Sequence, residues 1–383
     1  MTEPLALAGI RVLDLTELLP GPFATQMLAD MGADIIKIER PGVGDSARNM
    51  LPGTFRMVNR GKRSVELDLK SPDGREALLR LVKQADILVE GYRPGVMKRL
   101  GADYATLKAI APGLIYASIS GFGQTGPLRD IPGHDLNYNA VAGVLALCGS
   151  ADGPPEQAVG VPVADLSGSL YTVTSILAAL MLRQKTGQGQ YLDVSITDAV
   201  FTMVGPRLGS VQDTPGYGKK DVLCRTGYGI YETRDARHIA IGAIEDHFWA
   251  RLVKVLDIPL LQEARFAKSA QRWKAVDDLE PLIRARIREH SHDEWIEILN
   301  RNDVPVTTVT TLATVFEDPQ LVERGMILQG DGMRYVNYPV PMEGVDAARH
   351  GAPHSLGQDN AAILGAAGFT PEQIAALSKV SAA

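Results

Sequence analysis

Residues 10–39 read IRVLDLTELLPGPFATQMLADMGADIIKIE. The apolar run over 10–15 is typical of a buried strand, and the segment 23–31 has the apolar spacing of a helix. Gly32 follows this segment, where a glycine commonly ends a helix, and a second strand pattern occupies 34–39. A strand, a helix and a strand in this order predict a parallel βαβ unit.

The same alternation continues along the first half of the chain. Further strands are predicted at 64–69, 87–90, 114–118 and 191–194, and further helices at 73–84 and 166–185. Strands that alternate with helices predict an α/β fold in which helices cover a parallel sheet. No G-x-G-x-x-G pattern follows any of these strands and no Walker-type loop occurs, which disfavours an ordinary dinucleotide or nucleoside-triphosphate site.

The pattern changes after residue 200. The segment from 201 to 228 is rich in Gly, Pro and polar residues, which is typical of a linker between domains. One strand pattern and several helix patterns follow it. We therefore predict a large domain over 1–200, a linker over 201–224 and a smaller α+β domain over 225–328.

The composition of the whole chain is that of an ordinary soluble protein. Of its 383 residues, 45% are hydrophobic and 22% are charged, and the net charge of -6 gives no general footprint for nucleic acid or an acidic membrane surface. The amino terminus has no signal-peptide pattern, and the longest apolar stretch, 170–182, is too short to span a bilayer. We therefore expect a cytoplasmic protein that binds neither nucleic acid nor membrane.

The cysteine and histidine spacing does not indicate a metal site. Cys148 and Cys224 are too few for a disulfide framework or a zinc site, and we read both as buried thiols. His290 and His292 lack the third ligand that a zinc pattern needs, and we read both as solvated. No metal is therefore expected.

Three acid-base residues stand in separate turn-like stretches. His134 lies in GHDLNY (133–138), Asp165 in VPVADLSG (161–168) and Glu245 in GAIED (242–246). If the fold brings them together, an imidazole and a carboxylate can face a carbon acid from opposite sides, and a second carboxylate can orient the imidazole. Each residue also has a purely structural reading. His134 could be an exposed loop histidine, Asp165 a helix N-cap and Glu245 an acidic residue in the first turn of a helix. Asp246, next to Glu245, could exchange roles with it.

A series of short motifs is distributed along nearly the whole chain. They are LLPGPF (18–23), DMGAD (30–34), KIERP (37–41), NRGKRS (59–64), LDLK (67–70), EGYRPG (90–95), SGFG (120–123) and TGQGQ (186–190). In this order they resemble the CoA-transferase class III superfamily of CaiB/BaiF type. Within that superfamily, GHDLNY and Glu245 are most similar to the α-methylacyl-CoA racemases.

The resemblance implies an architecture and a ligand. It implies a Rossmann-like large domain that a return segment over 329–383 completes, a small domain, and two identical chains interlocked as a homodimer. The implied ligand is a coenzyme A thioester, with no further cofactor. Cations cluster at predicted strand ends, where α/β sheets bind ligands, and the candidate CoA contacts are Arg40, Leu69, Lys70, Tyr92, Arg93 and Arg99.

The resemblance also assigns roles to the acid-base residues. In our first hypothesis, a 2-methylacyl-CoA racemase, His134 and Asp165 exchange the α-proton on two faces while Glu245 hydrogen-bonds His134. A protonated Asp165 then requires a desolvated site, and backbone N–H groups near Asp165 are the candidate donors to the enolate oxygen. The alternative is a class III CoA-transferase in which Asp165 is a nucleophile that carries acyl and CoA adducts. A third hypothesis is a non-catalytic acyl-CoA-binding subunit.

Overall fold

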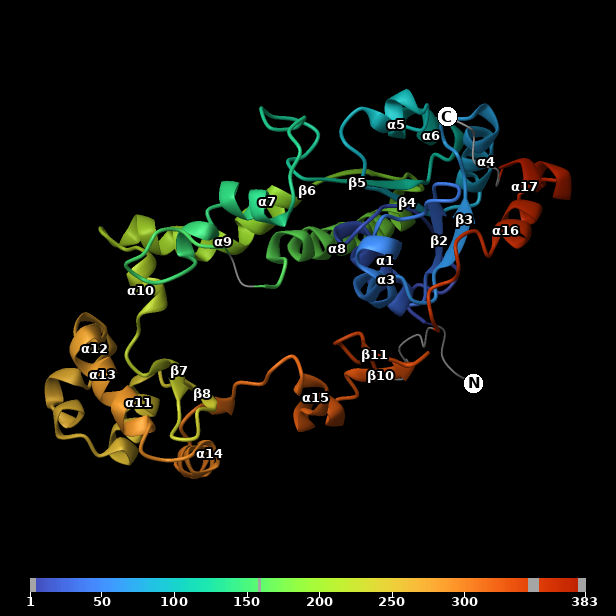
Figure 1. The fold of residues 1–383 in the computed structure, drawn as a ribbon. Helices are drawn as coiled ribbons and strands as arrows, with labels where there is room; N and C mark the ends of the chain where they lie inside the picture. The colour runs from blue at the N-terminus through green and yellow to red at the C-terminus, as the bar shows by residue number, and fades with distance from the viewer. Residues whose placement is uncertain (1–4, 158–159, 344–350, 378–383) are drawn as a thin grey trace. The chain divides into compact units, whose positions relative to one another are not determined.

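The computed structural model describes residues 5–157, 160–343 and 351–377 (Figure 1). The chain divides into two compact units. The first comprises the described residues within 1–144, 158–205 and 321–383, and the second those within 145–157 and 206–320. The chain therefore leaves the first unit and returns to it near its carboxyl end.

A six-stranded parallel sheet is the centre of the first unit, as the alternating pattern predicts. Its order is β3-β2-β1-β4-β5-β6. The strands are β1 (Arg11–Leu15), β2 (Asp34–Glu39), β3 (Arg63–Glu66), β4 (Ile87–Glu90), β5 (Ile115–Ser120) and β6 (Tyr191–Ser195). The strand order reverses between β1 and β4, and sheets of this kind bind ligands beyond the carboxyl ends of the strands at such a point.

Helices cover both faces of this sheet. Alternate strand residues point to opposite faces, so that Val12 and Ile87 belong to one core while Leu13 and Leu88 belong to the other. The first core is closed by α1 (Pro20–Asp30), α7 (Asp135–Val141), α8 (Val163–Thr186) and α9 (Ile196–Asp213). The second is closed by α4 (Pro72–Val82), α6 (Tyr104–Ile110), α16 (Asn360–Ala366) and α17 (Pro371–Leu377). The carboxyl-terminal helices lie near β3 and α4 in Figure 1.

The long helix α8 belongs to the core. By length and composition it could cross a membrane, but half of its most apolar window is buried inside the fold. Ala164 and Ile176 are fully buried, in the same core as α1 and the strands. The remaining elements of the first unit are α2 (Ala47–Met50), α3 (Pro52–Val58), α5 (Val96–Arg99) and the antiparallel pair β10 (Ile327–Gly330) and β11 (Met333–Val336).

The second unit combines a small antiparallel sheet with helices. The sheet order is β7-β8-β9, and Trp249 and Trp295 are buried in its core. The strands are β7 (Tyr228–Glu232), β8 (His238–Gly242) and β9 (Val306–Thr308). The helices are α10 (Lys219–Leu223), α11 (Asp246–Leu256), α12 (Ser269–Lys274), α13 (Val276–Ile287) and α14 (His292–Arg301). The short helix α15 (Pro319–Glu323) lies at the boundary between the two units. Short 3-10 helices lie at Leu145–Leu147, Pro259–Gln262, Ala264–Phe266 and Val315–Glu317.

The segment predicted as a linker, 201–224, is largely helical. It contains the second half of α9 and all of α10, and Pro206 lies inside α9. Ile196, Val200 and Val204 recur at a spacing of four residues and are all buried. Packing of this stripe stabilises α9 as far as Val204, beyond the predicted start of the linker.

Three side chains of the second unit differ from their predicted environment. The side chain of His292 is only 3% exposed, and its Nδ1 lies 2.7 Å from Asp293 Oδ1. The solvated reading is therefore wrong for His292, which begins α14 and is held by its carboxylate neighbour. Cys148 and Cys224 are partly exposed, not buried.

Candidate active site

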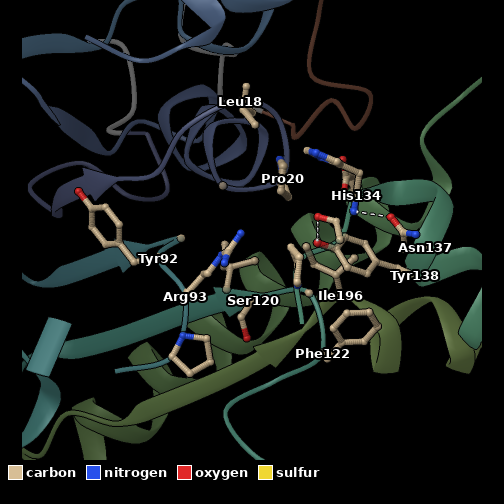
Figure 2. Close-up of a pocket in the computed structure, with 18 of the residues that line it drawn as sticks. Leu18, Pro20, Tyr92, Arg93, Ser120, Phe122, His134, Asn137, Tyr138 and Ile196 are labelled. Atoms are coloured by element: carbon tan, nitrogen blue, oxygen red, sulfur yellow. Dashed lines mark hydrogen bonds between the residues drawn. The ribbon is translucent and has the colours of Figure 1, made fainter. Parts of the chain in front are cut away.

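A cavity of about 430 Å³ opens at the carboxyl edge of the parallel sheet (Figure 2). Its walls are the loops that follow β1, β4 and β5 together with the first turns of α7 and α8. His134 and Asp165 both line it. The fold therefore brings two of the three predicted acid-base residues to one cavity, beside the point where the strand order reverses.

The first turn of α7 presents His134 to the cavity. His134 is the N-cap residue of α7, and its backbone N–H donates to Asn137 Oδ1 at 3.0 Å (Figure 2). The hydroxyl of buried Tyr138 donates to the carbonyl oxygen of Gly133 at 2.5 Å, and a Cβ at Gly121 would lie 2.3 Å from the tyrosine ring. The exposed His134 imidazole has no hydrogen-bond partner among the described residues of this unit, so it is free for a ligand.

Asp165 lies inside the first turn of α8 and does not cap it. The helix begins at Val163, two residues before Asp165. The cap comes from Asp135 of α7, whose Oδ1 accepts from the backbone N–H groups of Ala164 at 2.8 Å and of Asp165 at 3.1 Å. The N-cap reading of Asp165 is therefore wrong. These two N–H groups are already bonded, so they are not free to stabilise an enolate oxygen.

The Asp165 carboxyl is poised between its two protonation states. Burial raises its pKa to about 7, and the nearby charge of Asp135 acts in the same direction. Burial likewise raises the pKa of Tyr138 to about 12, with Asp165 as a second contributor. A carboxyl with a pKa near 7 can serve as a nucleophile when ionised and as an acid when protonated.

The loop after β1 forms another wall, and its backbone is unusual. Leu18 has a φ of 65°, in the left-handed region that leucine rarely adopts. The Leu18 N–H donates to Asp45 Oδ1 at 3.1 Å, and Lys37 Nζ donates to the Thr16 carbonyl oxygen at 2.7 Å. Ser169 of α8 donates its hydroxyl to the Pro20 carbonyl oxygen at 2.6 Å. The loop is therefore fixed by hydrogen bonds to two buried charged groups, Lys37 and Asp45, and to the helix that carries Asp165.

Those buried groups form an ion network that the sequence reasoning missed. Lys62 Nζ lies 3.1 Å from Asp14 Oδ2, and Lys37 Nζ lies 2.9 Å from Asp45 Oδ2, all four side chains being at most 2% exposed. Although burial opposes it, the charges of Lys37 and Lys62 hold the pKa of Asp14 well below its usual range. Burial lowers the pKa of Lys62 to about 8. In the sequence, this network is indicated only by two charged residues, Asp14 and Lys37, inside otherwise apolar strand segments.

A second cavity, of about 700 Å³, contains most of the predicted CoA contacts. Arg40, Leu69, Lys70 and Tyr92 line it, at the ends of β2, β3 and β4. Tyr92 lines both cavities, so the two adjoin at this side chain. Arg40 is 3.3 Å from Glu17, a residue of the first cavity.

The other two predicted CoA contacts lie elsewhere. Arg93 lines the first cavity, with His134 and Asp165, and is not among the residues that line the second. Arg99 is an exposed residue at the end of α5 and lines neither cavity. The position of these residues at strand ends therefore does not distinguish the two cavities, and their contact with CoA stays a prediction.

Glu245 belongs to the second unit and lines neither cavity. It is the N-cap residue of α11, with an exposed side chain that makes no capping hydrogen bond. Its neighbour Asp246 accepts from Arg272 at 2.8 Å and from the backbone N–H of Ser269 at 3.0 Å. The Asp246 carboxylate is therefore occupied by contacts within the second unit, and the predicted exchange of roles with Glu245 is not supported.

A comparison of the whole chain with models of protein families identifies its family. The model of CoA-transferase family III matches residues 7–360. The chain belongs to CoA-transferase family III. It is thus an enzyme of this family, and the hypothesis of a non-catalytic subunit is not supported.

Relatives in family III support the same assignment. The chain is 35% identical to acetyl-CoA:oxalate CoA-transferase of Acetobacter aceti, over 93% of this chain and 94% of the relative. It is 36% identical to succinyl-CoA:mesaconate CoA-transferase of Haloarcula marismortui, over 85% and 86%. A crystal structure of a CaiB/BaiF family protein from Brucella suis has a TM-score of 0.86 and 31% identity, covering 95% of this chain and all of that one. The relatives from Acetobacter aceti and Haloarcula marismortui are CoA-transferases by name, so they favour our alternative hypothesis over the racemase.

Proposed function

We propose that the protein transfers coenzyme A between an acyl-CoA and a carboxylic acid, with Asp165 as the nucleophile. The observation that carries the proposal is the position of Asp165, half-buried in a cavity at the carboxyl edge of the sheet. The relatives from Acetobacter aceti and Haloarcula marismortui, both CoA-transferases by name, support the same reaction class.

The reaction follows from the chemistry of a carboxylate nucleophile. The Asp165 carboxylate attacks the thioester carbonyl carbon and the C–S bond breaks. The CoA thiolate is released, and a mixed anhydride between Asp165 and the acyl group remains. The thiolate then attacks the Asp165 carbonyl carbon, which releases the donor acid and forms an aspartyl-CoA thioester. The acceptor carboxylate attacks the carbonyl carbon of that thioester, the C–S bond breaks with release of the thiolate, and a second mixed anhydride forms between Asp165 and the acceptor. The thiolate finally attacks the acceptor's carbonyl carbon, giving the new acyl-CoA and free Asp165.

The two adjoining cavities suit the two ends of the CoA thioester. The cations Arg40 and Lys70 line the second cavity and would bind phosphate groups, while Tyr92 would guide the pantetheine chain toward the first. The His134 imidazole is a free polar group beside the reaction site and a candidate donor to the thioester oxygen. The substrate thioester itself supplies the only coenzyme that this reaction requires.

Trapping of the covalent intermediate tests the proposal. The protein is incubated with acetyl-CoA and hydroxylamine, with and without a carboxylic acid, and the peptide containing Asp165 is examined by mass spectrometry. We expect an Asp165 hydroxamate that appears only with acyl-CoA, and no transfer by Asp165→Asn. Transfer by a folded Asp165→Asn variant would exclude this mechanism.

One observation favours a second candidate, the racemase. His134 and Asp165 share a cavity, and a pKa of about 7 lets Asp165 hold a proton near neutral pH. In that reaction Glu245 would orient His134. Incubation of a (2R)- or (2S)-2-methylacyl-CoA in deuterated water without an acceptor acid separates the two reactions. A racemase incorporates deuterium at C2 and scrambles its configuration, whereas a transferase leaves C2 unchanged.

A further inference from the structure

Three cationic or potentially cationic side chains line the reaction cavity: Arg93, Arg129 and His134. Arg129 is 3.5 Å from the carboxylate of its neighbour Asp130. Arg93 has no acidic partner within ion-pair distance among the described residues of the first unit. Figure 2 shows its side chain directed toward Pro20 and away from the ring of Tyr92. The cavity therefore presents an arginine whose charge no neighbouring carboxylate neutralises.

The charge of Arg93 does not lower the pKa of the proposed nucleophile, Asp165. Burial and Asp135 both raise the pKa of Asp165, and no cation contributes in the opposite direction. Arg93 instead acts on Tyr138, where its charge opposes burial and the charge of Asp165. Arg93 and Asp165 therefore line the same cavity, while the charge of Arg93 does not appear among the causes of the Asp165 pKa shift.

The second cavity has its own cations for the CoA phosphates. Arg40 and Lys70 line that cavity and Arg93 does not. Tyr92 and Arg93 are consecutive residues, and their side chains point to opposite sides of the chain after β4 (Figure 2). This geometry directs Tyr92 toward the shared boundary and Arg93 into the reaction cavity.

We infer that Arg93 binds a second carboxylate of the substrate acid, so that the site selects dicarboxylic over monocarboxylic acids. The inference rests on the proposed CoA transfer. A guanidinium presents a planar fork that matches a carboxylate with two parallel hydrogen bonds. Leu18, Pro20 and Ile196 line the same cavity and offer an apolar wall to the carbon chain between the two carboxylates.

Matched pairs of acceptor acids test this selection. Succinate, glutarate and adipate are each compared with the corresponding monoamide, which has nearly the same shape and one charge fewer. Acetyl-CoA and propionyl-CoA serve as donors, and the new acyl-CoA is quantified by mass spectrometry. For at least one chain length, we expect kcat/KM for the diacid to exceed that for its monoamide by about 10- to 100-fold, as for loss of a charge-assisted hydrogen bond.

Variants of the two arginines test which residue causes the preference for the diacid over its monoamide. Arg93→Gln should reduce the diacid-to-monoamide ratio to near one, and Arg93→Lys should restore part of it. Arg129→Gln is the matched control, because it removes a cation of the same cavity that already has a carboxylate neighbour, and it should keep the wild-type ratio. Collapse of the ratio in Arg129→Gln but not in Arg93→Gln would overturn the assignment.

Calorimetric titration with free CoA separates substrate selection from phosphate binding. We expect Lys70→Gln to weaken CoA binding and Arg93→Gln to leave the CoA Kd within about twofold of wild type. A large loss of CoA affinity in Arg93→Gln with an unchanged acid ratio would identify a phosphate ligand and refute the inference. Equal use of diacids and monoamides by the wild type refutes it while leaving CoA transfer intact. Absence of transfer to every acid instead refutes the proposed function, and the inference with it.

Discussion

Asp165 can attack a thioester only when its carboxyl is ionised. Because burial and Asp135 raise its pKa to about 7, most of the carboxyl is protonated below that pH. We expect kcat/KM for CoA transfer to rise about tenfold per pH unit below pH 7 and to level off above it. Initial rates between pH 5 and 9, with an acceptor acid fully ionised throughout, give the profile. A profile that is flat from pH 5 to 8 would show that Asp165 is already ionised.

The same carboxyl lowers the stability of the fold at alkaline pH. An acid with a raised pKa binds its proton more tightly in the folded than in the unfolded protein, so stability falls as pH rises from about 4 through 7. Asp165→Asn removes the buried charge at constant shape and should stabilise the protein by about 1–3 kcal/mol at pH 8. The gain should be smaller at pH 5. Urea unfolding at the two pH values measures it, and a variant no more stable than wild type at pH 8 contradicts the burial argument.

The contact between α7 and α8 links helix capping to the acidity of the nucleophile. Asp135 accepts two N–H groups of α8 and also raises the pKa of Asp165. Asp135→Ala should cost about 1 kcal/mol of stability through the lost cap. Asp135→Asn retains an acceptor oxygen and should cost less. Because both variants remove the charge, both should shift the pH profile of transfer toward lower pH. Two unshifted profiles would show that Asp135 does not influence the nucleophile.

The buried ion network should be the most sensitive part of the parallel sheet. Asp14→Asn leaves Lys37 and Lys62 with one carboxylate fewer in a buried site, and removal of one partner of a buried pair costs about 3–5 kcal/mol. The matched control is Asp34→Asn at the edge of β2, whose carboxylate is 37% exposed and pairs with Arg11 and Arg63. That change should cost at most about 1 kcal/mol. Chemical unfolding compares the two, and equal losses would show that burial does not matter here.

At the scale of the whole chain, local patterns predict the sheet well because each βαβ unit is encoded within a short segment. The run 87–90 is predicted with the bounds that β4 has, and the strand at 191–194 differs from β6 by one residue. The start of α8 is not predictable in this way, because its cap comes from Asp135, far away in the sequence. The ion network is also non-local, since it joins charges from β1, β2 and the segment before β3.

The candidate site shows the same limit. The motifs single out His134 and Asp165, and the fold brings both to one cavity, because each stands at the start of a helix beside the sheet edge. Which cavity receives Arg93 depends on the direction of its side chain after β4, and residue spacing carries no information on this point. The role of Glu245 depends on an arrangement beyond its own unit and stays a prediction.

The resemblance to CaiB/BaiF proteins leads us to propose a homodimer, and the surface of the first unit supports it. Large apolar side chains are exposed along α8 and α9, among them Met181 at 64% and Phe201 at 50%. The two helices lie side by side, since Thr202 and Tyr171 are hydrogen-bonded at 2.8 Å. Exposed apolar groups of this kind are typical of an interaction surface. Light scattering after gel filtration should give twice the chain mass of 41.2 kDa.

Charge substitutions on these helices test whether this surface is the interface. Met181→Asp and Phe201→Asp should weaken self-association, because burial of an unpaired carboxylate against apolar groups is strongly unfavourable. Leu312→Asp is the control, because Leu312 is 94% exposed in the second unit, away from both helices in the sequence. It should leave the mass of the assembly unchanged. If the chains are interlocked, the two helix variants should also lose thermal stability, since an interlocked subunit cannot separate without unfolding. A wild-type monomer at micromolar concentration would refute the dimer, and fully dimeric helix variants would place its interface on another surface.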